Sequence, residues 1–378
     1  MIFYENPTII IYAIVGFFVL VWYFVLTKIA LRGVIQIQKQ ADQTFHSANL
    51  PRLSVIIAFR NEAENLPRLA NLLLKQKYPK EKFEIILVND HSEDDWEYAL
   101  LKIKGQYKII NAKETGKKAA LKEGIVSANG EYVVTTDADC IVSEGWLNSI
   151  GSELIEKGND MIIGPVSIQQ GDGFLNFFQQ YDFIALQLFG LGYAKVNNPV
   201  MCNGANLIYS KKSFLEIGGK MKDSFTSGDD VFLMHEFKKA GFKIGTIISP
   251  SSIVYTKPEN TWQNVFIQHM RWGSKAKGYS DNMTLILALG VMCINLFVVS
   301  TLILSFFEFQ FLYLYLPIFI LKGLTDRYLL RKGIVLFNLR WKELKYWMMQ
   351  FIHPSFIVSV VILSFFIPVQ WKGRKVKS

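Results

Sequence analysis

Two aspartates separated by one residue are the first candidates for chemistry. Asp137 and Asp139 directly follow a β-branched and apolar run at residues 131–136, which is expected to form a buried strand. Carboxylates this close together at a strand end can bind a hard divalent cation and leave coordination positions for diphosphate oxygens. A solvated turn can show the same pattern, so the assignment needs support from other parts of the chain.

Two further polar residues stand where apolar runs end or helices begin. Asp90 follows the run at residues 83–89 and could bind a ribose or a base edge, or else cap the next helix. Lys117 precedes an expected helix at residues 119–125. A lysine and free backbone N–H groups at a helix N-terminus suit a phosphate, although a solvated lysine is the alternative.

Two later segments carry groups suited to glycosyl or phosphoryl chemistry. Asp229 and Asp230 precede an expected helix, where they could cap it or accept the proton of an acceptor hydroxyl. Gln268, Arg271 and Trp272 share one face of a helix because they are three and four residues apart. This face offers an amide, a guanidinium fork for diphosphate and an indole for a sugar ring, but such a belt is also common beside membranes.

The segment that would position these residues alternates short apolar runs with amphipathic helices between residues 51 and 260. The expected strands cover residues 53–58, 83–89 and 131–136, and an expected helix covers residues 64–76. Such alternation predicts an α/β fold with a mainly parallel, doubly wound sheet. Ligands of these folds bind beyond the carboxyl ends of the strands, where the candidate acids stand.

Both ends of the chain are apolar enough to meet a membrane, and 51% of all residues are hydrophobic. Residues 8–27 contain no charge, and Lys28 and Arg32 follow, which predicts an anchor with the next domain in the cytoplasm. Two or three spans are expected near the C-terminus, at residues 283–306, 311–321 and 348–369. Residues 327–345 are too charged to cross open lipid.

The net charge of +9 therefore indicates membrane lipids and phosphorylated substrates. We expect no nucleic-acid partner, because the chain lacks a dense basic stripe with interleaved aromatics. The expected organisation is an N-terminal transmembrane anchor (1–30), a juxtamembrane linker (31–50), a cytoplasmic catalytic domain (51–260), an amphipathic interface helix (261–281), a C-terminal transmembrane region (282–370) and a basic tail (371–378).

Together these motifs resemble family 2 of the inverting glycosyltransferases, which have the GT-A fold. The resemblance is to the membrane-bound branch with the cellulose, chitin, hyaluronan and poly-N-acetylglucosamine synthases. It rests on five segments in the family's order: VIIAFRNEAENL, VNDHSED, TTDADC, SGDDVFL and QHMRW. Asp229 stands where the synthases often have Glu, and about four expected spans are fewer than the large polymer synthases use.

The resemblance implies a role for each matching position. Donor and nucleotide binding falls to Glu62, Asp90, Lys117, Asp137, Gln268 and Arg271. Mg2+ or Mn2+ would bind at Asp139, and Asp230 would be the general base, with Asp229 beside it. The acceptor side would be formed by Trp272 and by the segment Gly204, Ala205 and Asn206.

The resulting expectation is a membrane-bound inverting glycosyltransferase in the bacterial inner membrane, with a cytoplasmic catalytic domain. It would move a hexose or N-acetylhexosamine from a UDP- or GDP-linked sugar to a hydroxyl of a lipid-linked or growing glycan acceptor. A processive β-polysaccharide synthase is the alternative within the same class. From a different class, a non-catalytic membrane subunit that binds nucleotide sugars also stays open, although the complete acidic set favours an enzyme.

Overall fold

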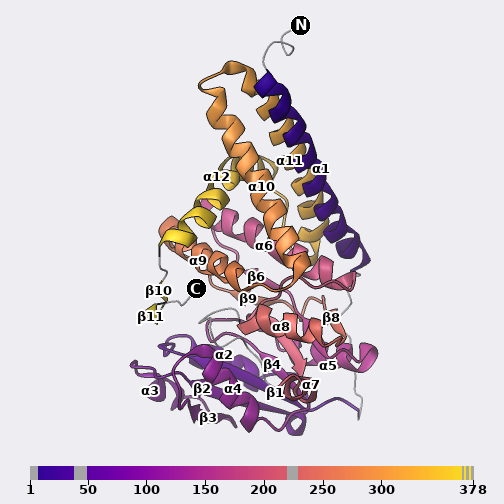
Figure 1. Cartoon of the computed structure of the whole chain (residues 1–378). Helices are drawn as coiled ribbons and strands as arrows, with labels where there is room; N and C mark the ends of the chain where they lie inside the picture. Colours follow the sequence, from indigo (N-terminus) through magenta and orange to yellow (C-terminus); the bar gives the residue numbers. More distant parts are fainter. Residues whose placement is uncertain (1–6, 38–48, 219–228, 368–369, 372–373, 376–378) are drawn as a thin grey trace.

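The computed structural model describes residues 7–37, 49–218, 229–367, 370–371 and 374–375. Ser227 and Gly228 of the SGDD motif, most of the expected linker and most of the basic tail lie outside the described residues. Figure 1 shows an α/β part at one end of the molecule and a bundle of long helices at the other.

Within the described residues, seven strands form one sheet in the order β3-β2-β1-β4-β7-β5-β8. Neighbouring strands are parallel except at β7, which is antiparallel to both β4 and β5. The strands are β1 (Leu53–Phe59), β2 (Phe83–Asn89), β3 (Lys108–Asn111), β4 (Tyr132–Thr135), β5 (Met161–Ile163), β7 (Leu207–Ser210) and β8 (Ile244–Thr246). The expected α/β fold with a mainly parallel sheet is confirmed.

Strand β1 is buried on both faces of the sheet. Val55 and Ile57 enter one apolar cluster and Ile56 enters another, because successive side chains of a strand point to opposite faces. The helices of this domain are α2 (Leu66–Leu74), α3 (Trp96–Leu100), α4 (Lys117–Ser127), α5 (Trp146–Lys157), α7 (Lys211–Glu216) and α8 (Asp229–Lys239).

A second layer lies between the sheet and the helix bundle (Figure 1). It contains the parallel pair β6 (Val166–Ile168) and β9 (Val254–Thr256), helix α6 (Gly173–Lys195) and helix α9 (Trp262–Ser274). The short strands β10 (Gln370–Trp371) and β11 (Arg374–Lys375) form a separate antiparallel pair near the end of the chain.

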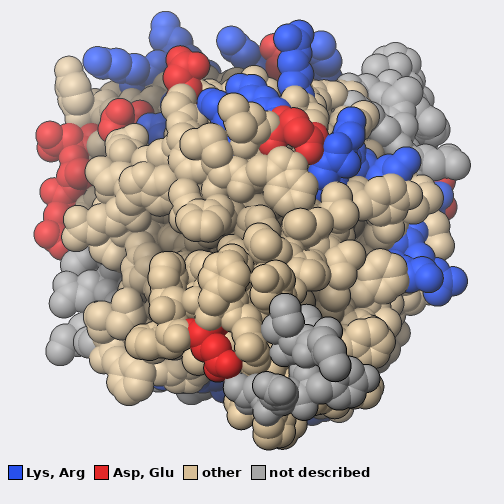
Figure 2. Space-filling view, turned by 90° about the horizontal axis from the view of Figure 1, so that it is seen from above, with Lys and Arg blue, Asp and Glu red and all other residues tan. Residues whose placement is uncertain are grey.

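The helix bundle consists of α1 (Pro7–Gln36), α10 (Asn282–Ser305), α11 (Leu312–Gly333) and α12 (Glu343–Phe366). In the described part of the chain, α1, α10 and α12 are long and apolar enough to cross a membrane. Viewed from the bundle end, the surface is mostly uncharged at its centre, and Lys and Arg gather toward its rim (Figure 2). Exposed aromatic residues such as Phe306 and Phe307 contribute to this surface.

Helix α1 approaches the second layer through glycines. A side chain at Gly33 would place its Cβ 1.9 Å from the backbone oxygen of Gly192 in α6. Small residues at such a crossing allow two helix backbones to come close together. The N-terminal helix is therefore packed directly against α6, whose residues also reach the candidate site.

Helix α11 does not end where the expected short span ends. It continues through Lys322 and Asp326, which pack inside the bundle rather than facing open lipid. The Lys322 ammonium, 1% exposed, donates to Asp326 (2.8 Å) and to Gln350 of α12 (3.1 Å). Tyr23 of α1 donates to the other oxygen of Asp326. This buried cluster joins α1, α11 and α12, and it explains how a charged segment packs beside apolar helices.

We expect Lys322→Met to destabilise the bundle, because it leaves the Asp326 carboxylate without its buried cation. Removal of one member of a buried ion pair typically costs about 3–5 kcal/mol. Thermal unfolding of the purified protein in detergent measures the effect. The double variant Lys322→Met with Asp326→Leu should recover part of the loss. Lys332→Met, at an exposed position of the same helix, is the control. Equal melting of the Lys322 variant and this control would contradict the account.

Candidate active site

One cavity of about 690 Å3 lies between the carboxyl ends of the central strands, helix α9 and the helix bundle. It brings together residues that are far apart in the sequence. Of the predicted site residues, those that line it are Glu62, Asp90, Lys117, Asp137, Asp139, Gly204, Ala205, Asp229, Asp230, Gln268, Arg271 and Trp272.

The donor side of the cavity is built from strand ends and the beginning of α4. The Lys117 ammonium lies 2.6 Å from a carboxylate oxygen of Asp137, which follows β4. The backbone N–H of Gly116 donates to Asp90, which follows β2 (2.8 Å). Gly116 has a φ of 115°, a conformation that side chains rarely adopt. These contacts hold two strand ends against the N-terminus of α4, where backbone donors suit a phosphate.

The residues around Lys117 keep its side chain protonated. Burial by itself lowers the pKa of this ammonium, but attraction to Asp137 and Asp229 raises the pKa above its ordinary value. The lysine therefore stays protonated and offers a fixed positive charge inside the cavity.

Asp139 lies close to other negatively charged side chains. Burial, together with repulsion from Asp137 and Glu62, raises the pKa of Asp139 to about 6. A cation would relieve this repulsion, so the carboxylates present fit a hard divalent ion. Among the described residues, no group of three or more His, Cys, Asp or Glu side chains is arranged to hold a metal.

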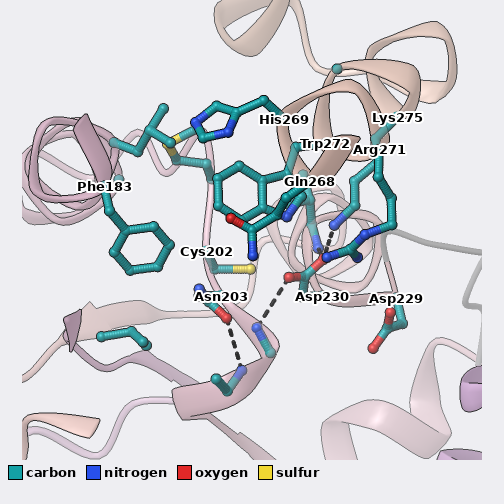
Figure 3. Close-up of a pocket in the computed structure, with 18 of the residues that line it drawn as sticks. Phe183, Cys202, Asn203, Asp229, Asp230, Gln268, His269, Arg271, Trp272 and Lys275 are labelled. Carbon is teal, nitrogen blue, oxygen red and sulfur yellow. Dashed lines mark hydrogen bonds and ion pairs between the residues drawn. The ribbon is translucent and has the colours of Figure 1, made fainter. Parts of the chain in front are cut away.

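Asp230 begins α8 and is held by several donors (Figure 3). One carboxylate oxygen accepts from the N–H of Gly204 (3.0 Å), and the other from the N–H of Val231 (2.8 Å). The Lys275 ammonium lies 3.6 Å from the latter oxygen. Burial alone would raise the pKa of Asp230, but Lys275 and the two N–H groups lower it. The carboxylate is therefore ionised and fixed in direction, as a general base requires.

Helix α9 presents three predicted residues to the same cavity. Its N-cap is Thr261, whose hydroxyl accepts from the N–H of Asn264. Gln268 donates to Glu259 (3.2 Å), and the Trp272 ring lies 5.8 Å from the ring of Phe183. Arg271 interacts electrostatically with Asp137, Asp229 and Asp230. The expected shared face of this helix is thus the one that covers the site.

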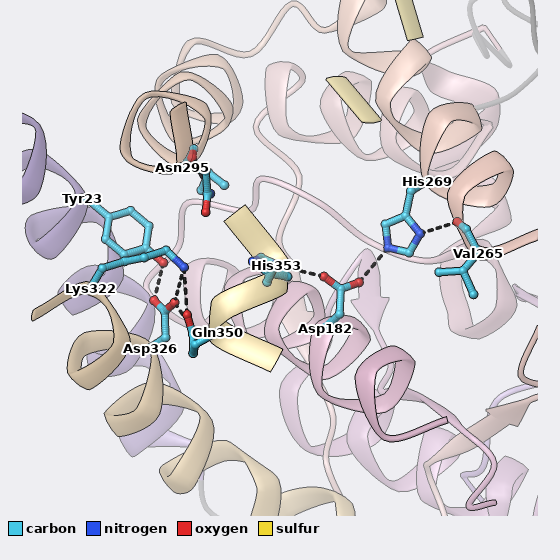
Figure 4. A network of polar contacts seen from close by, with 10 residues as sticks. Tyr23, Asp182, Val265, His269, Asn295, Lys322, Asp326, Gln350 and His353 are labelled. Atoms are coloured by element: carbon cyan, nitrogen blue, oxygen red, sulfur yellow. Dashed lines mark hydrogen bonds and ion pairs between the residues drawn. The ribbon is translucent and has the colours of Figure 1, made fainter. Parts of the chain in front are cut away.

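A buried polar cluster holds α9 from behind (Figure 4). Asp182 of α6 accepts from His269 of α9 (2.7 Å) and lies 3.0 Å from a ring nitrogen of His353 in α12. Burial by itself lowers the pKa of His269, but the attraction to Asp182 is stronger and raises this pKa above its ordinary value. In turn, both histidines hold the pKa of Asp182 below its ordinary value. The resulting charged contact joins α6 and α12 to the helix that carries Gln268, Arg271 and Trp272.

Asn206 is a predicted acceptor residue that the structure does not bring into the cavity. Its side chain is fully buried, donates to the backbone oxygens of Pro165 and Ser252, and accepts from the indole of Trp146. Its neighbours Gly204 and Ala205 line the cavity. The N–H of Gly204 donates to Asp230, and the N–H of Ala205 donates to the side chain of Asn203. An Asn buried by three such contacts supports the loop and does not face the acceptor.

Lys275, Cys202 and Tyr279 line the cavity but were not singled out from the sequence. A signal existed for Lys275, which comes three residues after Trp272 and so returns to the same side of the helix end. Asp182 gave no such signal, because it lies within a largely apolar helix and contacts His269 and His353, which are 87 and 171 residues away in the sequence.

Parts of the chain are similar to known glycosyltransferases. Residues 54–218 match the family described as Glycosyl transferase family 2. Glycosyltransferase AglE of Haloferax volcanii is 26% identical over 202 residues, which cover 52% of this chain and 65% of that protein. Poly-beta-1,6-N-acetyl-D-glucosamine synthase of Staphylococcus aureus is 26% identical over 236 residues, or 59% of this chain and 54% of the synthase. The chain thus spans less than two thirds of these relatives.

Among solved structures, the mannosyltransferase PcManGT of Pyrobaculum calidifontis, in complex with GDP-Man and Mn2+, has a similar fold. The TM-score is 0.59 at 16% identity, and the match covers 94% of this chain and 99% of that one. This likeness extends over the sheet and the helix bundle alike. Residues 54–218 are therefore similar to glycosyltransferase family 2, and the whole chain has a fold similar to that of this mannosyltransferase.

Proposed function

We propose that this protein is a membrane-bound inverting glycosyltransferase that uses a nucleotide-diphosphate sugar. It transfers a hexose or N-acetylhexosamine to a hydroxyl of a lipid-linked or growing glycan acceptor. The observation that carries the proposal is the position of Asp230. Its fixed, ionised carboxylate shares one cavity with the Lys117–Asp137 pair and Asp139, so a base and a diphosphate site face the same space.

The donor would occupy the side of the cavity next to the strand ends. Glu62 and Asp90 suit hydroxyl and base groups of the nucleoside, which is UDP- or GDP-linked in this proposal. Lys117 and Arg271 bring positive charge toward the diphosphate, and Gln268 supplies an amide beside them. Asp137 holds Lys117 in place through its ion pair. The GDP-Man bound to the similar fold from Pyrobaculum calidifontis supports a nucleotide sugar as the donor.

The reaction would be a single displacement. The acceptor hydroxyl oxygen forms a bond to the anomeric carbon, and the bond from that carbon to the diphosphate breaks. The hydroxyl proton passes to Asp230, and the nucleoside diphosphate leaves with the bonding electrons. Attack from the face opposite the diphosphate inverts the anomeric configuration. Lys117 and Arg271 stabilise the negative charge that grows on the leaving group. Trp272 offers its ring face to the sugar or acceptor.

Asp139 is the residue proposed to hold Mg2+ or Mn2+, with Asp137 in support. When bound, the cation supplies electrostatic stabilisation of the diphosphate oxygens. The Mn2+ in the similar structure supports the use of a divalent cation.

The proposed location is the bacterial inner membrane, with the catalytic domain on the cytoplasmic side. Lys28 and Arg32 lie at the end of α1 that joins this domain, which agrees with the preference of basic residues for the cytoplasmic face. The apolar helices α1, α10 and α12 would provide the membrane contact.

We expect Asp230→Asn to lower the rate of transfer by about 10²–10⁴-fold, the usual contribution of a general base. Donor binding should persist, because Asp230 does not belong to the diphosphate side. The purified protein in nanodiscs is given a panel of nucleotide sugars, and the release of nucleoside diphosphate measures the rate of transfer. The dependence of this rate on donor concentration reports donor binding. Asp172→Asn, an exposed acid at the beginning of α6, is the control. Unchanged release in the Asp230 variant would contradict the assigned base.

Replacement of Lys275 should change the pH dependence of the reaction. A protonated Asp230 cannot accept a proton, so the rate falls as the pH falls through the pKa of this carboxyl. Lys275 lowers that pKa, hence Lys275→Met should raise it and move the acidic limb of the pH–rate profile to higher pH. Lys277→Met, on the same turn and outside the cavity, should leave the limb in place. An unshifted limb in the Lys275 variant would contradict the electrostatic role.

Transfer should stop when divalent cations are removed with a chelator and return when Mg2+ or Mn2+ is added. In Asp139→Asn, the metal concentration for half-maximal rate should rise by at least about tenfold, because a charged oxygen ligand is lost. Asp95→Asn removes an exposed carboxylate elsewhere and should behave as the unmodified protein. Identical metal titrations for both variants would rule out Asp139 as the ligand.

A further inference from the structure

The cavity has a second part whose chemistry differs from that of the donor side. Beyond Asp230 and Lys275 it extends toward the helix bundle, where its walls are apolar. Two helices of the bundle contribute one face each, at helical spacing. We call this part the apolar groove, and its main walls are Ala288, Val291 and Met292 of α10 and Ile357, Val361 and Phe365 of α12.

The apolar groove reaches the surface of the helix bundle. Phe365 is 58% exposed although it lines the cavity, and Ala288 is exposed as well. Residues on the neighbouring face of α10, such as Leu285 and Leu289, are exposed and apolar. The mouth of the groove is therefore surrounded by the same kind of surface that a membrane-spanning helix presents to lipid. A hydrocarbon chain could pass from the bilayer into the groove without meeting water.

At its inner end the apolar groove meets the general base. Cys202 and Tyr279 line the cavity near Asp230, and Tyr279 lies three residues before the start of α10. Figure 3 shows the Cys202 thiol beside the Asp230 carboxylate. The polarity of the wall thus changes from charged to apolar within one continuous space.

The change from charged to apolar walls favours one of the two proposed kinds of acceptor, a lipid or a glycan chain, over the other. A hydrated glycan chain would have to place its hydroxyl groups against walls that offer no hydrogen-bond partner, which is costly for each buried polar group. A hydrocarbon chain that enters from the bilayer has no such cost, because the apolar walls replace lipid surroundings that are equally apolar. The walls therefore favour a lipid.

We propose that the apolar groove between α10 and α12 binds the hydrocarbon chain of a membrane-lipid acceptor. The head-group hydroxyl of that lipid then lies at Asp230, and one sugar is added to it per encounter. This inference rests on the proposed glycosyl transfer and specifies its acceptor class. It predicts a glycolipid as the product rather than a ladder of long glycans.

Photolabelling tests the binding site without requiring turnover. The full chain in nanodiscs would receive a long-chain n-alkyl glycoside with a diazirine at the end of its chain, and adducts would be mapped by mass spectrometry. Adducts are expected at residues 288–292 and 357–361. Ala288→Trp, which fills the groove mouth, should reduce them by at least about tenfold. Leu289→Trp, the next residue on the exposed face of α10, is the matched control and should leave them unchanged.

Chain-length dependence tests the same site through activity. Alkyl glycosides with one common head group and either a butyl or a hexadecyl chain would be compared as acceptors. The long chain should give at least about a tenfold higher kcat/KM. Ala288→Trp should remove this advantage, whereas Leu289→Trp, outside the cavity lining, should preserve it. Equal use of both chains, or equal labelling in the two tryptophan variants, would overturn the groove assignment.

The outcomes separate this inference from the proposed function. If no donor is turned over and Asp230→Asn changes nothing, the glycosyltransferase proposal itself fails. If transfer depends on Asp230 but long soluble glycans form regardless of Ala288→Trp, the lipid groove alone is wrong.

Discussion

Carboxylates crowd the carboxyl edge of the central sheet, and the surrounding structure balances their charge. Asp137 and Asp139 follow one strand end, and Asp229 and Asp230 begin a helix that faces it. Lys117, Lys275 and Arg271 supply the opposite charge from three different elements. Burial and the negative charges of Asp137 and Glu62 outweigh the attraction of Asp139 to Lys117 and raise the pKa of Asp139. A divalent cation would reduce this excess of negative charge, as proposed for Asp139.

The positions of two positively charged side chains at this edge depend on helices outside the α/β domain. Arg271 and Lys275 lie on or just after α9, which is held from behind by the contact of Asp182 with His269 and His353. His353 belongs to α12, and α12 is linked in turn to α11 and α1 through the Lys322 cluster. Figure 4 shows both polar clusters on the two sides of α12. Helix α9 is therefore positioned by helix α6 and by the helix bundle.

Much of the site could be predicted because its residues stand at element boundaries. Strand ends and helix beginnings are marked by abrupt changes from apolar to polar residues, which identified Asp90, Lys117, Asp137 and Asp230. Contacts between distant segments leave no such mark. Asp182 meets a histidine 87 residues away, and Asn206 turns inward to Trp146 although its neighbours face the cavity. The antiparallel insertion of β7 and the apolar groove also depend on tertiary packing that periodicity does not encode.

The central claim is that Asp230 drives a single displacement at the anomeric carbon, and the configuration of the product tests it most directly. A nucleotide sugar of known anomeric configuration would be turned over by the purified protein, and the coupling constant of the anomeric proton would be read by NMR during the first turnovers. The account predicts a product of opposite configuration to the donor. A product with the donor's configuration would contradict it, because retention requires two displacements or attack from the leaving-group face.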